Sequence, residues 1–435
     1  MANFCKSVFV FCVAFYVVCA KHEVYDGHTL YEVFVKNEDQ AKFVNGLETK
    51  IPVDFFVYAH TSRNGQVLVS KEQRKGFEDL LTSGDVEYKV LAENIREQLE
   101  MEERILAQHK DDKSNRFALG VEALSYNHIH RYEVVDDYLV RLGNAFPELV
   151  TVVSAGQSFE GRDVKYLKIS TTNFEDRRKP VVFVMSLLHA RDWVGLPGTL
   201  YTIDQLVLNV TESDLVNDID WIILPIANPD GFEFTHTDFR FWRKNRRTGL
   251  TPDNSCLGVD LNRNFDIFWG TASSNNVCSD VFHGPEPFSE PETQNIRGIF
   301  EAYSDRIELF IDLHAHGSMI LFGFGNGQLA PNALTLNLVG VNMAQAIDRV
   351  KWNAKPDYSV GNIYYATTAA SGVASDFAHA LGIPLSYTFD LPAIRGISAG
   401  NLGYLVELAF IRQAGYETWE GIKVGARIVR DFLNR

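Results

Sequence analysis

A histidine and an aspartate, His189 and Asp192, stand three residues apart just after an unbroken apolar run at residues 181–186. The run is short and rich in valine, which predicts a strand buried on both faces. A strand that ends in this way presents an imidazole nitrogen and a carboxylate oxygen together. That pair suits a divalent metal, zinc above all, if a further ligand comes from elsewhere in the chain. The His-x-x-Asp pattern alone also arises by chance, so the metal hypothesis depends on the rest of the sequence.

Further polar groups follow other predicted strands. His314 and Asp390 each come directly after a predicted strand, at residues 309–313 and 385–389. Ligands of open α/β sheets bind beyond the carboxyl ends of the strands. We therefore expect these two side chains to meet His189 and Asp192 at one edge of a sheet, in an enzyme-like site. His316 shares a strand face with His314 by alternation, so it is a competing candidate for the metal ligand.

The elements that would hold these residues form two regions. The first alternates short strands with helices, which predicts a two-layer α/β sandwich. Its strands are expected at 31–35, 53–57 and 86–91. One helix is expected between the first two strands, and two more are expected at 72–81 and at 92–108. The second region is a longer α/β alternation that predicts a large domain. Its expected helices lie at 134–144, 196–208, 289–303 and 417–433, and a further strand lies at 221–226. A capping box from Ser289 to Glu292 is expected to open the third of these helices.

A polar, basic segment at residues 109–116 separates the two regions. Exposed linkers of this kind are where proteolysis concentrates. A trypsin-like protease would cut after Lys113 or Arg116. A plain solvated linker explains the same composition, so both interpretations stand.

Composition and the N-terminus bound the class of protein. The formal net charge of −15 argues against nucleic acid as a partner. Residues 1–20 combine Lys6, an apolar segment and a small-residue end at Ala20, which predicts a secretory signal peptide. The apolar segment is too short for a transmembrane anchor. We therefore expect a secreted, extracellular protein with no membrane anchor.

Cysteine usage agrees with an extracellular location. The chain has 5 cysteines, and only Cys256 and Cys278 lie beyond the predicted signal peptide. An even pair in an oxidising compartment predicts one disulfide. Asn209 begins an N-glycosylation sequon.

Four short motifs carry a family resemblance. They are His189-Ala190-Arg191, Asn228-Pro229-Asp230-Gly231, Trp242-Arg243-Lys244 and Gly258-Val259-Asp260-Leu261-Asn262-Arg263-Asn264. With these motifs the chain resembles the zinc metallocarboxypeptidases of the carboxypeptidase A and B type, in their secreted proenzyme form. The resemblance implies an α/β fold, in which a small α/β sandwich pro-domain precedes a large domain with a central mixed, twisted β-sheet flanked by helices. It further implies a signal peptide at 1–20, a pro-segment at 21–116 that covers the cleft until the linker is cut, and a monomeric enzyme domain at 117–435.

The resemblance assigns the metal site and the catalytic groups. His189, Asp192 and His314 match the protein ligands of one zinc ion. Asp260 resembles the carboxylate that orients a ligand histidine, a common arrangement around zinc. Arg243 matches the arginine that polarises the scissile carbonyl, where a fixed cation stabilises the developing oxyanion.

The resemblance also assigns the substrate-binding groups. Asn262 and Arg263 match the clamp on the terminal carboxylate of the substrate, a task that suits the planar guanidinium group. Arg191 matches an accessory site along the cleft. The specificity pocket would be lined by Gly325, Ile363, Ala370 and Ser375. Because Ser375 stands where basic-specific members carry an acidic residue, we expect a preference for neutral aliphatic or aromatic C-terminal residues. Cys256 and Cys278 fall where the family places its disulfide.

Three positions depart from the family pattern. Asp192 and Asp390 stand where the family carries glutamate as zinc ligand and general base, and Thr368 stands where it carries the tyrosine that caps bound substrate. Tyr364 and Tyr365 lie nearby but do not align with that position. Each Glu-to-Asp change withdraws the carboxylate by about 1.5 Å, and a misplaced base can cost roughly 10²-fold in rate. Two hypotheses therefore stand: a secreted zinc metallocarboxypeptidase acting on peptide C-termini, and an impaired relative that binds peptide C-termini without efficient hydrolysis.

Overall fold

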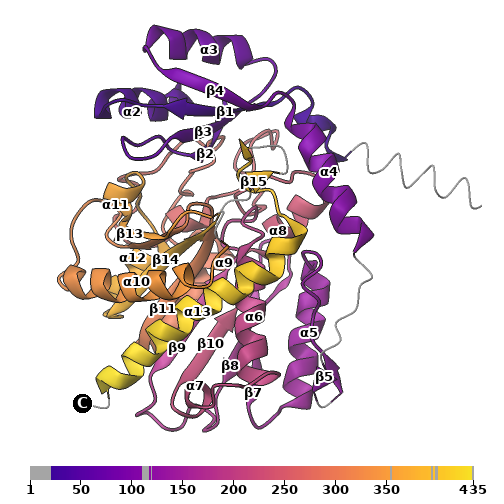
Figure 1. Cartoon of the computed structure of the whole chain (residues 1–435), viewed down its shortest axis with the longest axis vertical. Helices are drawn as coiled ribbons and strands as arrows, with labels where there is room; N and C mark the ends of the chain where they lie inside the picture. The colour runs from indigo at the N-terminus through magenta and orange to yellow at the C-terminus, as the bar shows by residue number, and fades with distance from the viewer. Residues whose placement is uncertain are drawn as a thin grey trace, which may run out of the picture.

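The computed structural model describes residues 21–109, 117–118, 120–352, 355–392, 395–396 and 400–433. The expected signal peptide at 1–20 and the expected cleavage sites at Lys113 and Arg116 lie outside the described residues. No helix within these described ranges is both long enough and apolar enough to cross a membrane. Figure 1 shows a small N-terminal domain at one end of a larger one, with helix α4 beside their junction.

The small domain is a four-stranded antiparallel sheet with helices α2 and α3 on one face (Figure 1). The strand order is β2-β3-β1-β4, and the bounds are β1 Thr29–Phe34, β2 Val53–Val57, β3 Gly65–Val69 and β4 Glu87–Ala92. The helical elements are η1 Glu23–Tyr25, α2 Glu38–Asn45, η2 Gly46–Thr49, α3 Arg74–Ser83 and α4 Ile95–Gln108. The predicted two-layer sandwich is confirmed, although β3 was not predicted.

Side chains that alternate along β1 give the small sheet two buried faces. Tyr31 and Val33 pack with residues of α2 and α3 in one apolar cluster. Leu30 points to the opposite face, where it joins Phe56, Leu68 and the main core of the large domain. The small domain therefore docks through the sheet face that its own helices leave open.

The large domain is built on an eight-stranded mixed sheet in the order β13-β12-β14-β11-β9-β10-β8-β7. Its strands are β7 Val150–Gln157, β8 Asp163–Ile169, β9 Val181–Ser186, β10 Asp220–Leu224, β11 Ile307–Ala315, β12 Met319–Phe322, β13 Ser359–Asn362 and β14 Leu385–Leu391. The four central strands β14, β11, β9 and β10 are parallel. Two short ribbons pair β5 Phe117–Ala118 with β6 Val121–Glu122 and β15 Arg395–Gly396 with β16 Gly400–Asn401. The mixed sheet predicted from the family resemblance is confirmed.

Helices cover both faces of the large sheet (Figure 1). Their bounds are α5 Tyr132–Ala145, α6 Gly195–Val207, α7 Asp214–Asn217, α8 Pro229–Thr237, η3 Leu261–Arg263, α9 Pro291–Tyr303, α10 Ala333–Asp348, α11 Ile363–Ala366, α12 Ala374–Ala380 and α13 Leu408–Leu433. In β9, Val182 and Val184 face the core formed with α6, α10 and α13. Phe183 and Met185 face the second core, formed with α9 and α12. Both faces are buried, which explains the unbroken apolar run of this strand.

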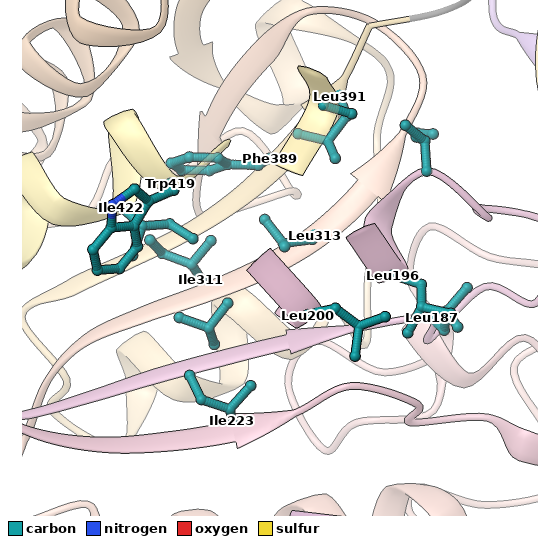
Figure 2. Close-up of a cluster of buried hydrophobic side chains, with 14 of the residues drawn as sticks. Leu187, Leu196, Leu200, Ile223, Ile311, Leu313, Phe389, Leu391, Trp419 and Ile422 are labelled. Atoms are coloured by element: carbon teal, nitrogen blue, oxygen red, sulfur yellow. The ribbon is translucent and has the colours of Figure 1, made fainter. Parts of the chain in front are cut away.

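The larger core lies directly under the strand ends that matter for the site. Figure 2 shows Ile311 and Phe389, from β11 and β14, beside Trp419 and Ile422 of α13. These side chains are almost fully buried. The carboxyl ends of the central strands are therefore held on a close-packed base, which limits movement of the residues attached to them.

The capping box expected at the start of α9 is not formed. Glu290 is the N-cap residue and makes no side-chain capping bond. The Ser289 hydroxyl instead donates to the Glu290 carboxylate. The Glu292 carboxylate accepts hydrogen bonds from the backbone of Phe159 and the side chain of Asn245. The capping-box prediction was wrong because both side chains are used by other contacts.

Parallel pairing brings the predicted site residues to one edge of the sheet. Strand β11 lies between β9 and β14. Leu313 of β11 pairs with Ser186, the last residue of β9, and His314 pairs with Asp390 of β14. Both strands run slightly further than predicted, so His314 and Asp390 lie within them. The edge formed by β9, β11 and β14 positions the site.

Candidate metal centre and active site

Three buried side chains converge at this edge. His189, Asp192 and His314 each offer one ligand atom, and these atoms lie within 4.8 Å of one another. Oδ2 of Asp192 lies 3.5 Å from Nδ1 of His189 and 3.0 Å from Nδ1 of His314. Oδ1 of Asp192 is buried without a hydrogen-bond partner among the described residues. Two imidazole nitrogens and a carboxylate with an unused oxygen are a donor set that fits zinc.

The charge on Asp192 is stabilised by its neighbours. Burial favours the neutral acid, but hydrogen bonds from His189 and His314 hold the pKa of Asp192 well below its usual range. Asp192 is therefore an anion at neutral pH, as a metal ligand must be. His316, the competing candidate, is outside this cluster. It lines the adjoining cavity, with its ring centroid 5.0 Å from that of Tyr404.

Asp260 links the ligand cluster to Arg243. Its Oδ1 accepts a hydrogen bond from Nε2 of His189 at 3.0 Å, and its Oδ2 accepts two from Arg243 at 3.0 and 2.8 Å. Burial opposes ionisation, but the charges of Arg243 and His189 hold the pKa of Asp260 well below its usual range. Asp260 is held here because it caps η3, where it accepts the backbone N–H of Asn262 at 3.0 Å. One carboxylate thus orients a metal ligand and a cation together.

A second carboxylate, Asp312, lies behind His314. Its Oδ2 is 2.6 Å from Nε2 of His314. Burial acts to lower the pKa of His314, but the charge of Asp312 and hydrogen bonds to Asp192 and Asp312 raise it to about 10. Asp312 was not identified from the sequence. The available signal was strand periodicity, since residues two apart on β11 face the same side.

A cavity of about 140 Å³ opens beside the metal ligands. The polar side chains of the large domain in its wall include His189, Arg243, Asn262, Arg263, His314, His316, Thr388 and Asp390, together with Thr367, Thr368 and Tyr404. The structure therefore brings together both predicted catalytic residues, two of the predicted ligands and the predicted carboxylate clamp. Arg191 and Ser375 are not in this wall.

Asp390 is partly exposed within the cavity. Burial of the carboxyl group there raises the pKa of Asp390. The positive charge of His314 lowers this pKa, and the negative charge of Asp192 raises it further. A carboxyl group with a raised pKa beside a metal site has the character of a general base.

Asn262 and Arg263 are held between the metal ligands and α12. Nη1 of Arg263 donates to the carbonyl oxygen of Asn262 at 2.7 Å. Oδ1 of Asn262 accepts the backbone N–H of Ala374 at 2.8 Å, and Nδ2 of Asn262 lies 3.4 Å from Nε2 of His314. The loop that carries this pair and Asp260 is closed by a disulfide between Cys256 and Cys278.

The expected specificity residues only partly line the cavity. The nonpolar part of the wall includes Leu321, Ile363, Ala370 and Val373, and Thr388 also lines the cavity. Ser375 is fully buried behind Thr388, and the two hydroxyl oxygens are 3.0 Å apart. Gly325 lies behind the wall, where its carbonyl accepts the N–H of Ala370 at 2.9 Å. Thr388 was missed, although it precedes Asp390 by two residues on the same strand and so shares its face.

Thr368, which stands where the family resemblance places the capping tyrosine, lies in the cavity wall. Tyr364 and Tyr365 are exposed. The Tyr365 hydroxyl donates to the carbonyl of Gly327 at 3.3 Å. Neither tyrosine belongs to the lining of the cavity in this structure.

The small domain covers the cavity. Its contribution to the wall is Phe55, Phe56, Val57, Tyr58 and Arg63. Asp54 accepts hydrogen bonds from Nη1 of Arg191 at 2.9 Å on both carboxylate oxygens. Arg191 is 1% exposed, and its guanidinium carbon lies 4.3 Å from the ring centroid of Tyr404. The predicted accessory site is therefore occupied by the small domain.

Comparisons with known proteins agree with this arrangement. Residues 135–421 match the family described as zinc carboxypeptidase, and residues 31–102 match the carboxypeptidase activation peptide. A carboxypeptidase B from Helicoverpa zea is 42% identical over 427 residues, which cover 96% of this chain and 97% of the relative. A carboxypeptidase B from Astacus astacus is 32% identical over 313 residues, covering 71% of this chain and 99% of the relative. The crystal structure of the carboxypeptidase A from Helicoverpa armigera matches with a TM-score of 0.91 and 54% identity, over 94% of this chain and 99% of that chain.

Proposed function

Since this chain belongs to the zinc carboxypeptidase family and is a metallocarboxypeptidase, we propose that it removes neutral aliphatic or aromatic residues from the C-termini of peptides. The observation that carries the proposal is one cavity that holds metal ligands, a candidate base and Arg263 together. An exopeptidase must recognise a terminal carboxylate next to its reacting groups. A guanidinium in the same cavity as the ligands meets that need.

His189, Asp192 and His314 would hold one Zn²⁺. When bound, zinc supplies Lewis-acid polarisation of a carbonyl and a lowered pKa of water. The Oδ1 of Asp192, which has no hydrogen-bond partner in the described ranges, supports this assignment, because a buried carboxylate oxygen without a partner is costly unless it has a ligand.

The remaining side chains bind the peptide and move protons. Arg263 and Asn262 bind the terminal carboxylate. Arg243, oriented by Asp260, donates to the scissile carbonyl oxygen as negative charge develops there. Asp390 takes a proton from the attacking water and returns it to the leaving amine as the C–N bond breaks. The raised pKa of Asp390 supports this role, because a base works best when its pKa approaches the working pH.

The substrate preference rests on the cavity wall. Leu321, Ile363, Ala370 and Val373 give this wall nonpolar surface, and Thr388 adds an uncharged hydroxyl. Ser375 offers only a buried hydroxyl behind Thr388. A pocket of this kind favours an apolar side chain. The relatives' names do not decide the substrate, because they include both carboxypeptidase A and carboxypeptidase B.

We further propose that the protein is secreted as a precursor and activated by cleavage within residues 109–116, after Lys113 or Arg116. The match to an activation peptide supports a precursor form. The contacts of the small domain with Arg191 and the cavity wall support its role as an intramolecular inhibitor.

The proposal is tested on purified precursor before and after tryptic cleavage. Zinc content is measured, and hydrolysis is followed on blocked dipeptides that end in phenylalanine, leucine, lysine or an amide. We expect one zinc per chain, hydrolysis of the phenylalanine and leucine substrates, and none of the amide. A chelator should abolish the activity and added zinc should restore it. A preference for lysine would contradict the pocket assignment, and inhibitor binding without turnover would favour the impaired relative.

A further inference from the structure

Asp312 is a buried carboxylate that the proposed reaction does not use. It interrupts the apolar strand β11 and is 0% exposed. Its Oδ2 lies 2.6 Å from Nε2 of His314, and its Oδ1 is buried with no hydrogen-bond partner in the described part of the chain. A buried carboxylate destabilises a fold unless it is paired. The pairing with His314 is therefore the contact that accounts for it.

The two histidine ligands have the same arrangement. His189 directs Nε2 to Asp260 at 3.0 Å and Nδ1 to Asp192 at 3.5 Å. His314 directs Nε2 to Asp312 at 2.6 Å and Nδ1 to Asp192 at 3.0 Å. In each ring, a carboxylate on Nε2 holds that nitrogen as the N–H donor and leaves Nδ1 for a metal.

We propose that Asp312 is a positioning residue that orients His314 and strengthens zinc binding. The inference rests on the metal site of the proposed function. A carboxylate hydrogen-bonded to an imidazole ligand fixes its tautomer and raises its basicity. The carboxylate of Asp312 also attracts the zinc ion through buried, low-dielectric surroundings.

The contact between Asp312 and His314 matters more for zinc affinity because the third ligand, Asp192, is short. Aspartate reaches about 1.5 Å less far than the glutamate that the family resemblance predicts at this position. A more basic His314 offsets part of the affinity that a shorter carboxylate loses. The two carboxylates, Asp192 and Asp312, thus act on the same metal.

The test is the zinc affinity of the full precursor, measured by competition with a chelator. D312N keeps the volume and an acceptor oxygen but removes the charge, whereas D312S removes the charge and also shortens the side chain. The matched control is D204N, at a carboxylate that is equally buried and accepts hydrogen bonds from Tyr126 and Tyr138. We expect the zinc Kd to rise about 10- to 100-fold for D312S, less for D312N, and not at all for D204N.

The unfolding temperature of each metal-free variant separates positioning from folding. A weaker zinc affinity for D312N, with a metal-free unfolding temperature equal to that of D204N, supports the inference. Equal zinc affinity of the wild type and D312N overturns it and leaves the metal site standing. A wild type that binds no zinc overturns the proposed function itself. If D312S fails to fold, the zinc affinity of D312N alone tests the inference.

Discussion

His314 and Asp390 are paired residues of two neighbouring parallel strands, β11 and β14. This register fixes the backbone of the candidate base relative to a candidate metal ligand. The strands rest on a close-packed core, so the backbone has little freedom to adjust. The length of the Asp390 side chain therefore decides how far its carboxylate reaches.

D390N removes the proton acceptor and keeps the side-chain volume. We expect kcat of the activated enzyme to fall by about 10²- to 10⁴-fold, with zinc content and inhibitor binding unchanged. Steady-state kinetics on a blocked phenylalanine dipeptide measures the change. D238N, at a residue on the exposed surface, serves as the control. A D390N enzyme that keeps most of its kcat would show that another group carries the proton.

The double variant D192E/D390E gives both side chains the reach that the family resemblance predicts at these positions. If reach limits the reaction, kcat/KM should rise by roughly 10²-fold. Both single variants are measured beside it, because the metal ligand and the base act on the same centre and their effects need not add. A double variant slower than the wild type would mean that the surroundings have adjusted to the shorter carboxylates.

R263A removes the proposed clamp on the terminal carboxylate. A charged hydrogen bond contributes about 1.5–3 kcal/mol, so we expect KM to rise roughly 10- to 100-fold. The variant should also lose most of the discrimination between a free C-terminus and an amidated one. Kinetics on a matched acid and amide pair measures both effects. Unchanged discrimination would place the carboxylate clamp elsewhere.

D54N removes the anionic partner of Arg191 in the small domain. Leaving Arg191 buried without a counter-charge weakens docking, so the uncut D54N precursor should hydrolyse small substrates at least about 10-fold faster than the uncut wild type. Asp85 is 94% exposed in the same domain, which makes D85N the matched control. Equal activity of the uncut D54N and wild-type precursors would remove this ion pair from the inhibitory contact.

E292Q tests a pH dependence of stability. Burial raises the pKa of Glu292 to about 7, partly opposed by hydrogen bonds from Phe159 and Asn245. The folded state therefore binds this proton more tightly than the unfolded state, so the resulting stabilisation is present below the ordinary pKa and is lost as pH rises toward 7. The loss is at most roughly 3 kcal/mol. Urea unfolding of E292Q should show a smaller fall in stability between pH 4.5 and 7.5 than the wild type, whereas E133Q, at an exposed carboxylate, should follow the wild type.

The sequence motifs predicted the fold class and the meeting of His189 with His314, because both residues end predicted parallel strands. Contacts between distant segments could not be predicted in this way. Asp54 and Arg191 are 137 residues apart, and no local pattern pairs them. Asp312 was overlooked although His314 was already a candidate ligand, because strand alternation places the two residues on one face but does not show that their side chains are hydrogen-bonded. Strand β3 was missed although it has the same 5-residue length as the predicted β2, because it begins with glycine, which is a weak strand residue.

The open face of the small sheet carries Leu30, Phe56 and Leu68, which are buried against the large domain. If the proposed cleavage of the linker releases the small domain, these side chains meet water. An exposed apolar surface of this kind favours self-association and unfolding, and unfolded fragments are readily degraded. The free inhibitor is thereby removed from solution, which would make activation a one-way step.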